Sequence, residues 1–496
     1  MQIGSLIRRA ALHHKDAPCL VEGERVVSFR EFNALTDRVG HALLDCGLVS
    51  GDRVGVLLPN GIDCLVVYYA LAKSGLVRVS MNTRETIDNH RYKLADSGSR
   101  AVIHYGLDDN LGVEMAIGPD QLAGLLTAQD KGPCAVDRDL EAPLRLGYTG
   151  GTTGQSKAVT LTTRGELSEL TAFLTDLVPE LGPKDTFLHA APIAHASGAF
   201  FLPALVRGAR SVVMKKFDPA TFIELGVQSK ATVTFLVPTM LAMILEQPEL
   251  ADADLRLTRI AYGASPISPA ALARAEQRFG RIFAQTYGQA ESPMVITCLR
   301  PEDHDRAGSC GRPFTTVEAG IIDDDGRLLA PGEVGEIVCR GTQLMAYYWE
   351  RPEATAEAFR HGWLHTGDVG RMDEDGFFYI LDRKNDMLIS GGYNVYPREV
   401  EEVLLSYDGV IEAAVIGLPD EKWGDRVHAV VAGRDGLDTA EMLEFAKTRL
   451  ASFKAPKSIE IWPDLPKSSA NKILRRSIRD VVTEREATRR VAEQTA

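Results

Sequence analysis

The sequence predicts an α/β protein. We expect a large N-terminal domain of parallel and mixed sheets with helices and a small β subdomain, joined by a hinge to a small α+β C-terminal domain. Three observations support this: strands alternate with helical segments up to about residue 300, hairpin signals follow, and a compact new pattern begins after a charged run. Because 496 residues exceed one ordinary core, we place the domains at residues 1–382 and 383–496.

The first 300 residues repeat a strand followed by a helix. VGVLLP at residues 54–59 precedes CLVVYYALAKSG at residues 64–75, and residues 211–230 and 231–247 repeat the order. Short apolar runs are typical of buried parallel strands, and the longer segments after them predict the covering helices. Residues 1–14 predict a short amphipathic helix.

Asp-Gly turns mark the predicted β subdomain. From Val317 to Arg340 the pattern predicts short strands, IIDDDGRLL at residues 321–329 and then GEVGEIVCRG at residues 332–341, and MDEDGFFYIL at residues 372–381 repeats the Asp-Gly device. These segments predict antiparallel hairpins. After LDRKND at residues 381–386, the pattern predicts a helix from Pro397, two strands, a helix and a further strand ending near Trp462.

Composition and charge exclude several classes of protein. The net charge of −13 is spread along the chain, which argues against nucleic acid as the main partner. The longest apolar run is interrupted by Pro59, Asp63 and Lys73, so we expect no membrane span, and the N-terminus lacks an apolar secretory core. Seven cysteines without CxxC spacing predict reduced core residues in a cytoplasmic protein.

YTGGTTGQSK at residues 148–157 predicts a loop that wraps a polyphosphate. Its glycines let successive backbone N–H groups turn inward, while threonine hydroxyls and Lys157 add donors and a positive charge. The flanking segments predict strands, so the loop links strand to strand. A Walker A loop is excluded because two residues separate Gly154 from Lys157.

Five further motifs follow in order: YGQAES from residue 287, GEIVCRG from 335, WLHTGD from 363, DRKNDMLISGGYNVYPREVE from 382 and LPKSSANKILRR from 465. With the loop at residue 148, the series resembles the adenylate-forming superfamily of acyl-CoA and aryl-CoA synthetases, firefly luciferase and peptide-synthetase adenylation domains. The resemblance covers essentially the whole chain. It implies ATP, Mg²⁺ and coenzyme A as cofactors and a small carboxylic acid as substrate.

The resemblance implies a nucleotide site. Glu291 is the implied Mg²⁺ ligand, since Mg²⁺ takes oxygen ligands beside substrate phosphates. Tyr287 is implied to stack on the adenine. Asp368, with Arg383, is implied to hold the ribose hydroxyls, which a carboxylate can accept. The implied nucleotide-binding residues are Thr149, Gly150, Gly151, Thr152, Thr153, Gly154, Lys157, Gly263, Ala264, Tyr287, Gly288, Gln289, Asp368, Arg383 and Lys472.

Catalysis is implied to involve Lys472, which in the pattern PKxxxxK bridges the carboxylate and the α-phosphate. The usual Gly before it is Asn471, as in some chlorobenzoate:CoA ligases, which hints at an aromatic acid. Asn385 is the implied hinge about which the small domain rotates between the two half reactions. Ala290 stands where the family usually carries Thr, and we expect a backbone N–H or Thr153, the latter a catalytic candidate, to compensate for the missing hydroxyl donor.

An acid pocket is implied around His195, which falls between the acyl and adenylate sites and is also a catalytic candidate. Small residues and the lack of Arg or Lys at these positions favour an apolar or aromatic monocarboxylic acid. The implied substrate-binding residues are His195, Ala196, Ser197, Gly198, Val237, Gly263, Ala264, Pro293 and Met294.

Coenzyme A is implied to bind the C-terminal domain through Gly391, Gly392, Trp423, Phe453 and Lys457, although a plain β-turn is the alternative reading of the two glycines. Ala455 stands where chlorobenzoate ligases have Arg. The favoured function is an AMP-forming carboxylate:CoA ligase. A stand-alone adenylation enzyme that loads a carrier protein, and a non-catalytic nucleotide-binding protein, are the alternatives. A homodimer stays open.

Overall fold

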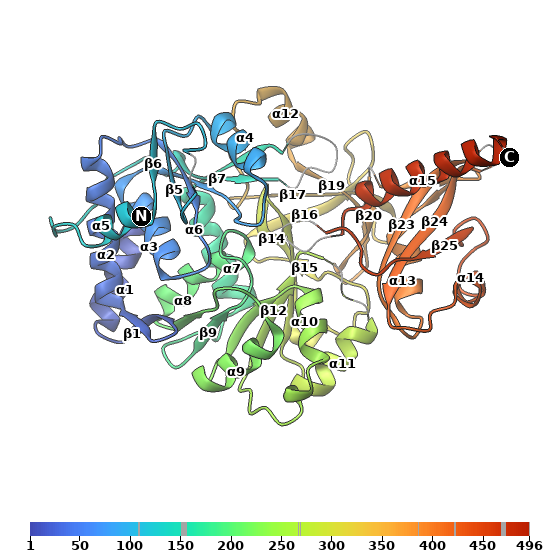
Figure 1. Cartoon of the computed structure of the whole chain (residues 1–496), viewed down its shortest axis with the longest axis horizontal. Coiled ribbons are helices and arrows are strands. Elements are labelled where there is room, and N and C mark those ends of the chain that lie inside the picture. Colours follow the sequence, from blue (N-terminus) through green and yellow to red (C-terminus); the bar gives the residue numbers. More distant parts are fainter. Residues whose placement is uncertain are drawn as a thin grey trace.

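A computed structural model describes residues 1–107, 110–149, 156–265, 267, 269–384, 386–420, 423–467 and 473–495. The chain forms a larger body from its N-terminal part and a smaller body from its orange and red C-terminal part (Figure 1). In the described residues the larger body contains three sheets and the smaller body one. The predicted fold class is confirmed.

The largest sheet is mixed. Its nine strands run in the order β15 (Arg312–Pro313), β14 (Ser292–Leu299), β13 (Phe283–Gln289), β12 (Arg259–Gly263), β11 (Val233–Leu236), β9 (Thr186–His189), β10 (Arg210–Val213), β1 (Pro18–Glu22) and β2 (Arg25–Ser28). The strands from β13 to β1 are parallel, whereas β2, β14 and β15 pair antiparallel at the two edges.

The second sheet has the same construction. Its seven strands run in the order β18 (Tyr347–Tyr348), β8 (Ala158–Thr162), β7 (Pro143–Tyr148), β4 (Val77–Ser80), β3 (Arg53–Leu57), β5 (Ala101–His104) and β6 (Met115–Ile117). The strands from β7 to β6 are parallel, and β8 and β18 are antiparallel. The predicted strands on both sides of the phosphate loop are therefore confirmed as β7 and β8.

Helices follow the strands of both sheets, as the sequence pattern predicts. Those of the larger body are α1 (Ile3–His14), α2 (Phe29–Asp45), α3 (Ile62–Ser74), α4 (Ile87–Ser97), α5 (Pro119–Leu126), α6 (Thr163–Ala172), α7 (Ala196–Ala199), α8 (Phe201–Arg207), α9 (Pro219–Ser229), α10 (Pro238–Leu245), α11 (Pro269–Phe279) and α12 (Pro352–Ala358), with short 3₁₀ or π turns at Phe173–Leu177, Pro248–Leu250, Pro301–Asp303 and Arg360–Gly362.

Helix α3 contains most of the longest apolar run of the sequence, for which we expect no membrane span. Every residue from Cys64 to Leu71 is buried, because a helix that is apolar on all sides is covered by its neighbours. It packs against α1 and α2 and ends at Gly75, whose φ of 73° caps the helix in the left-handed conformation. Within the described ranges, no helix has both the length and the apolar character that crossing a bilayer requires.

The third sheet is antiparallel, in the order β16 (Val317–Ile322), β17 (Val334–Gly341), β19 (Leu364–Met372) and β20 (Phe378–Arg383). The second predicted hairpin is confirmed as β19 and β20. The first is wrong in part: after the Asp-Gly turn only an isolated bridge joins Ile322 to Leu328, and β16 pairs with β17. Pro331 and Gly332 prevent an extended second strand, since Pro lacks an N–H and Gly332 has a φ of 89°.

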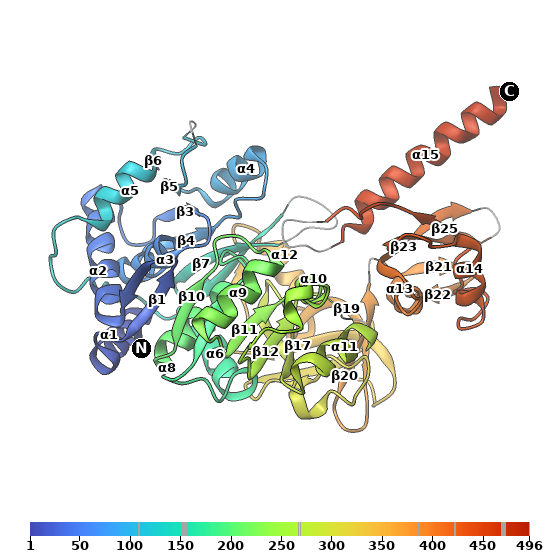
Figure 2. The same ribbon diagram turned by 60° about the horizontal axis from the view of Figure 1, so that its bottom comes forward.

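The smaller body has a sheet in the order β22 (Tyr393–Val395), β21 (Leu388–Ser390), β24 (Gly424–Gly433) and β23 (Val410–Asp420), with β25 (Ser458–Ile461) beside β24. Val415 faces the core under α13 (Pro397–Leu405) and α14 (Thr439–Lys447), while Ile416 faces the core of α15 (Arg475–Thr495). This alternation covers both faces of the sheet. Helix α15 then projects beyond the sheet (Figure 2).

The cysteine prediction is correct for six residues and wrong for one. All seven thiols are free, and Cys46 at the end of α2 is exposed, whereas the others are buried. Burial raises the pKa of the Cys134 thiol to about 11, which leaves it protonated at neutral pH. The six buried thiols act as small apolar residues of the core.

Candidate active site

The predicted site residues follow the carboxyl ends of neighbouring parallel strands. His195 lies in the connection after β9, Val237 directly follows β11, Gly263 ends β12, and Tyr287 lies near the end of β13. Because parallel strands place these ends on one edge of the sheet, ligands bind there in open α/β sheets. Sequence segments about 100 residues apart therefore meet at this edge.

The phosphate loop is closed at its base by its two end residues. The backbone N–H of Thr149 donates to the carbonyl of Lys157 at 3.1 Å, and the N–H of Lys157 donates to Oγ1 of Thr149 at 3.2 Å. Tyr148 anchors the preceding strand, since its hydroxyl donates to Asp96 Oδ2 at 3.0 Å. Five predicted residues, Gly150, Gly151, Thr152, Thr153 and Gly154, lie outside the described residues.

The predicted adenine and ribose residues lie in direct contact. Tyr287 donates its hydroxyl proton to Asp368 Oδ2 at 2.5 Å, and Arg383 Nε lies 3.3 Å from Asp368 Oδ1. Asp368 and Arg383 are opposite each other in the pairing of β19 and β20. Burial and then the Asp368 charge raise the pKa of Tyr287, so the phenol remains a donor. A carboxylate has lone pairs left for further hydroxyl donors.

The predicted metal ligand has a partner that the sequence prediction missed. Tyr348 on β18 donates its hydroxyl proton to Oε1 of Glu291 at 2.6 Å. The ammonium of Lys157 lies 4.9 Å from the centre of the Tyr348 ring. Burial and the Glu291 charge raise the pKa of Tyr348, which keeps its hydroxyl protonated. One phenol thus contacts both the phosphate-loop lysine and the predicted metal carboxylate.

His195 precedes α7 and is exposed to solvent, yet crowding by protein atoms lowers the pKa of its imidazole. Its Nε2 lies 2.8 Å from Nδ2 of the buried Asn82. Because an amide nitrogen only donates, this contact fits a neutral ring that accepts at Nε2 and carries its proton on Nδ1.

The backbone around the predicted acid pocket is tightly packed and locally strained. Ala264 has a φ of 70° and Met294 a φ of 56°, a region that non-glycine residues rarely adopt and that occurs often at functional sites. A Cβ on Gly288 would come within 2.5 Å of the Met294 Cα, so glycine is required there. The other predicted residues nearby are Ala196, Ser197 and Gly198 in α7, Gln289 in β13 and Pro293 in β14.

The residues predicted for coenzyme A form one aromatic group in the smaller body. The N–H of Gly391 donates to the Trp423 carbonyl at 2.7 Å, and Lys457 Nζ lies 4.7 Å from the centre of the Trp423 ring. Phe453 stacks on Tyr393 with a centroid distance of 4.6 Å. Gly391 and Gly392 have φ values of 60° and 82° in the turn between β21 and β22, as the β-turn alternative expects.

Two further predicted residues, Asn385 and Lys472, also lie outside the described part, so their placement stays a prediction. Three contacting residues were missed: Asn82, Tyr348 and Tyr393. Tyr393 lies inside the motif DRKNDMLISGGYNVYPREVE and was the easiest to find from sequence. Asn82 contacts His195 and Tyr348 contacts Glu291, and the members of each pair lie more than 50 residues apart along the chain. A single sequence does not reveal such contacts.

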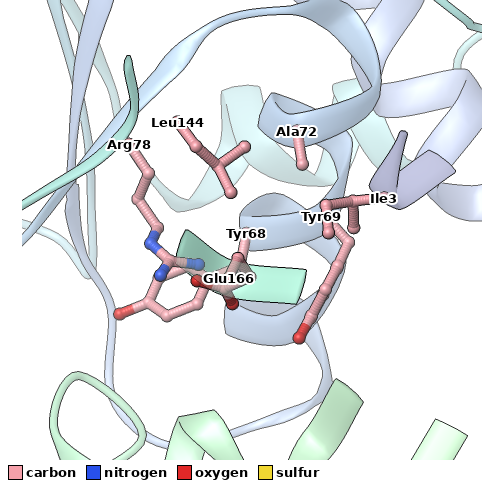
Figure 3. A pocket seen from close by; sticks show the side chains of 7 residues that line it. All are labelled: Ile3, Tyr68, Tyr69, Ala72, Arg78, Leu144 and Glu166. Atoms are coloured by element: carbon pink, nitrogen blue, oxygen red, sulfur yellow. The ribbon is translucent and has the colours of Figure 1, made fainter. Parts of the chain in front are cut away.

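A small cavity lies apart from these residues, beneath α3 and β4 (Figure 3). Its volume of about 10 Å³ holds roughly one water molecule. The lining residues are Ile3, Tyr68, Tyr69, Ala72, Arg78, Leu144 and Glu166, and none belongs to the predicted site. This cavity is too small for an organic substrate.

Comparisons with known proteins agree with the geometry. The AMP-binding enzyme family matches residues 7–349, and the AMP-binding enzyme C-terminal domain matches residues 399–472. The medium/long-chain-fatty-acid–CoA ligase FadD8 of Mycobacterium tuberculosis is 36% identical over 96% of this chain and 89% of its own length. Feruloyl-CoA synthase of Amycolatopsis sp is 36% identical over 96% of this chain and 98% of its own length.

Among solved structures, ATP-bound MatB from Rhodopseudomonas palustris superposes with a TM-score of 0.89 at 29% identity, covering 97% of this chain and 99% of that protein. The match includes both bodies of the chain. Together with the contacts of Tyr287, Asp368, Arg383 and Glu291, these similarities lead to one conclusion: the chain belongs to the AMP-binding enzyme family, within the adenylate-forming superfamily of acyl-CoA and aryl-CoA synthetases.

Proposed function

We propose that this enzyme is an ATP-dependent carboxylate:CoA ligase for an apolar or aromatic monocarboxylic acid. In the first half reaction the acid oxygen attacks the α-phosphorus of ATP, which forms an acyl-adenylate and releases pyrophosphate. In the second, the thiol of coenzyme A attacks the acyl carbon and AMP leaves. The observation that carries the proposal is the contact of Asp368 with both Tyr287 and Arg383.

Three properties of the predicted acid site support the proposed class of acid. Small side chains at Ala196, Ser197 and Gly198 leave room for a ring or an alkyl chain. No lysine or arginine occurs among the predicted pocket positions, so a second carboxylate would lack a charged partner there. Desolvation lowers the pKa of the His195 imidazole, which disfavours a positive charge at that position.

The Mg²⁺ site is proposed to rest on Glu291. Its carboxylate fits the ion, because Mg²⁺ in nucleotide sites uses one or two carboxylates together with substrate phosphates. Within the described ranges, no three His, Cys, Asp or Glu side chains gather closely enough to bind a metal by themselves. When bound, Mg²⁺ would neutralise phosphate charge as pyrophosphate leaves.

The remaining roles are proposed from the family pattern. Lys472, Thr153 and His195 would act in adenylate formation, and Asn385 would be the pivot between domains 1–382 and 383–496. Strand β20 ends at Arg383, one residue beyond that boundary. Trp423, Phe453, Lys457 and the glycines at positions 391 and 392 would bind coenzyme A. A cytoplasmic location and a homodimer stay predictions.

A pyrophosphate-release screen tests the proposal. Benzoates, cinnamates, straight-chain acids and dicarboxylic acids are each assayed with and without coenzyme A, and the products are identified as acyl-AMP or acyl-CoA. We expect release with monocarboxylic acids and acyl-CoA only when coenzyme A is present. Acyl-AMP without any acyl-CoA at millimolar coenzyme A would favour the carrier-loading alternative. Tight ATP binding without pyrophosphate release from any acid would favour the non-catalytic alternative.

A further inference from the structure

We propose that Tyr348 is a positioning residue whose hydroxyl orients the Glu291 carboxylate for the metal ion and whose ring holds Lys157. This inference rests on the proposed function, in which Glu291 binds Mg²⁺ and Lys157 binds phosphate. The hydroxyl of Tyr348 lies 2.6 Å from Oε1 of Glu291, and the Lys157 ammonium lies 4.9 Å from its ring centre. A single side chain therefore contacts both groups that act on the triphosphate.

The fold holds Tyr348 at this place through its backbone. Strand β18 pairs antiparallel with β8, which puts Tyr348 opposite Val159, two residues after Lys157. The N–H of Tyr348 donates to Oγ1 of Thr355 at 3.0 Å. Only 9% of the tyrosine is exposed. Its hydroxyl is thus fixed by a paired strand and by burial rather than by a mobile loop.

The backbone of Glu291 is tied to the same segment. The N–H of Met345, three residues before Tyr348, donates to the Glu291 carbonyl at 2.8 Å. One chain segment thus holds the backbone of Glu291 through Met345 and its carboxylate through Tyr348. The rotamer of the glutamate is set at both ends, which is the arrangement that preorganises a metal ligand.

The hydrogen bond also gives the two carboxylate oxygens of Glu291 different roles. The phenol donates to Oε1, so the carboxylate presents Oε2 as the oxygen with free lone pairs for a cation. A donor at one oxygen orients the carboxylate without taking up the second, as partners behind metal ligands do.

The ring of Tyr348 contacts the ammonium group of Lys157. A Lys ammonium over an aromatic face is attracted by the ring quadrupole, but more weakly than by a carboxylate. This contact would hold Lys157 beside Glu291 while its three N–H donors stay available to phosphate oxygens. The hydroxyl therefore orients the anion and the ring holds the cation, and the two functions can be separated by substitution.

Tyr348→Phe removes the hydroxyl and keeps the ring. Tyr347→Phe is the matched control, because it makes the same change one residue earlier on β18, where the ring stacks on Trp349. Glu291→Gln removes the proposed ligand charge. Binding of Mn²⁺ to each full-length protein with a non-hydrolysable ATP analogue is followed by electron paramagnetic resonance, and thermal unfolding confirms that each variant is folded.

We expect Tyr348→Phe to weaken Mn²⁺ binding by about 10- to 100-fold, the range found when the partner of a metal ligand is removed. Tyr347→Phe should bind like the parent protein, and high free Mg²⁺ should restore adenylate formation by Tyr348→Phe. Equal Mn²⁺ binding by the Tyr348 and Tyr347 variants, with Glu291→Gln impaired, would overturn the positioning role. Unimpaired binding by Glu291→Gln would instead overturn the metal site of the proposed function.

If Tyr348→Phe proved unstable, the contact between the Tyr348 ring and Lys157 could be tested by changing the lysine and leaving Tyr348 and Glu291 in place. Lys157→Arg keeps the positive charge over the ring but changes its donor geometry. We expect this variant to retain the Mn²⁺ affinity of the parent protein while its KM for ATP rises, because the hydroxyl still holds Glu291. Loss of Mn²⁺ affinity in Lys157→Arg comparable to that of Glu291→Gln would contradict the separation of the two functions.

Discussion

Asp382 and Arg475 form an ion pair in which Arg475 Nη1 lies 3.0 Å from Asp382 Oδ1. Asp382 is buried in β20 of the larger body, whereas Arg475 begins α15 in the smaller body. The same guanidinium binds Asp386 at 3.0 Å and Glu401 at 2.6 Å. Of the three carboxylates, Asp382 alone precedes the predicted pivot, Asn385. Rotation of the smaller body would therefore change this contact and leave the other two in place.

We predict that Asp382→Asn changes the balance between the two half reactions. Asp382 also accepts the N–H of Arg398 at 2.7 Å, so the substitution weakens two contacts with the smaller body. The described arrangement resembles an ATP-bound relative, so adenylate formation should slow by about tenfold, the effect of losing one charged hydrogen bond. Thioester formation from supplied acyl-AMP should change less. Both rates are measured by single-turnover kinetics.

Asp386→Asn is the control for this prediction. It removes the same charge from the same arginine, but Asp386 lies on the far side of the predicted pivot. We expect the ratio of the two half reactions to stay at the parent value. An equal shift in both variants would mean that Arg475 stabilises the smaller body without selecting its orientation.

Lys472→Ala is expected to slow acyl-adenylate formation by roughly 10² to 10³, the effect of removing one group that stabilises developing charge. Thioester formation from supplied acyl-AMP should survive, because this lysine is proposed to act in the first half reaction only. Pyrophosphate release and acyl-CoA formation are measured separately. Equal loss in both steps would contradict that assignment.

Trp423→Ala is expected to raise the KM for coenzyme A by roughly tenfold, equivalent to about 1.4 kcal/mol. The ring contacts the Lys457 ammonium at 4.7 Å and lies against the Gly391 backbone, so its loss removes an aromatic surface beside a cation. Adenylate formation should stay nearly intact. Trp462→Ala, also in the smaller body but near α15, is the control, and a similar rise in its KM would indicate a general loss of structure.

We predict a pH effect on stability from Glu169, on α6. Arg145 is shared between Glu166 at 2.8 Å and Glu169 at 3.0 Å. Burial raises the pKa of Glu169 from 4.5 to about 8. Between these values the folded chain binds more protons at this residue than the unfolded chain, so this contribution to stability is full below pH 4.5 and is lost as the pH rises through 8.

Glu169→Gln removes this titration and keeps a similar shape. Its unfolding temperature should therefore fall less than that of the parent protein between pH 6 and pH 8.5, by roughly a few degrees, as followed by circular dichroism. Glu141→Gln makes the same change in an exposed ion pair with Arg164 and serves as the control. A parent-like pH slope in Glu169→Gln would refute the buried titration.

Some of the site could be predicted because its chemistry is local in sequence. Tyr287 and Glu291 belong to the motif YGQAES, Asp368 belongs to WLHTGD, and Arg383 lies in the motif that begins at residue 382. Tyr348 could not be found this way, because its role depends on β18 pairing with β8 across almost 190 residues. A tyrosine in the apolar run LMAYYW at residues 344–349 is expected to be an ordinary core residue, so the sequence gives no sign of such a partner.

The sequence by itself determined the α/β class, the order of strands and helices, and the six motifs, because periodicity, turn residues and short-range spacing are properties of neighbouring residues. Only the tertiary structure decided which groups meet: Asn82 with His195, Tyr348 with Glu291, and Arg475 with Asp382. It also decided that β16 pairs along its length with β17 and with the residues after its turn only through one bridge. The physical reason is that such contacts are selected by the joint burial and pairing of distant segments, which no local pattern specifies.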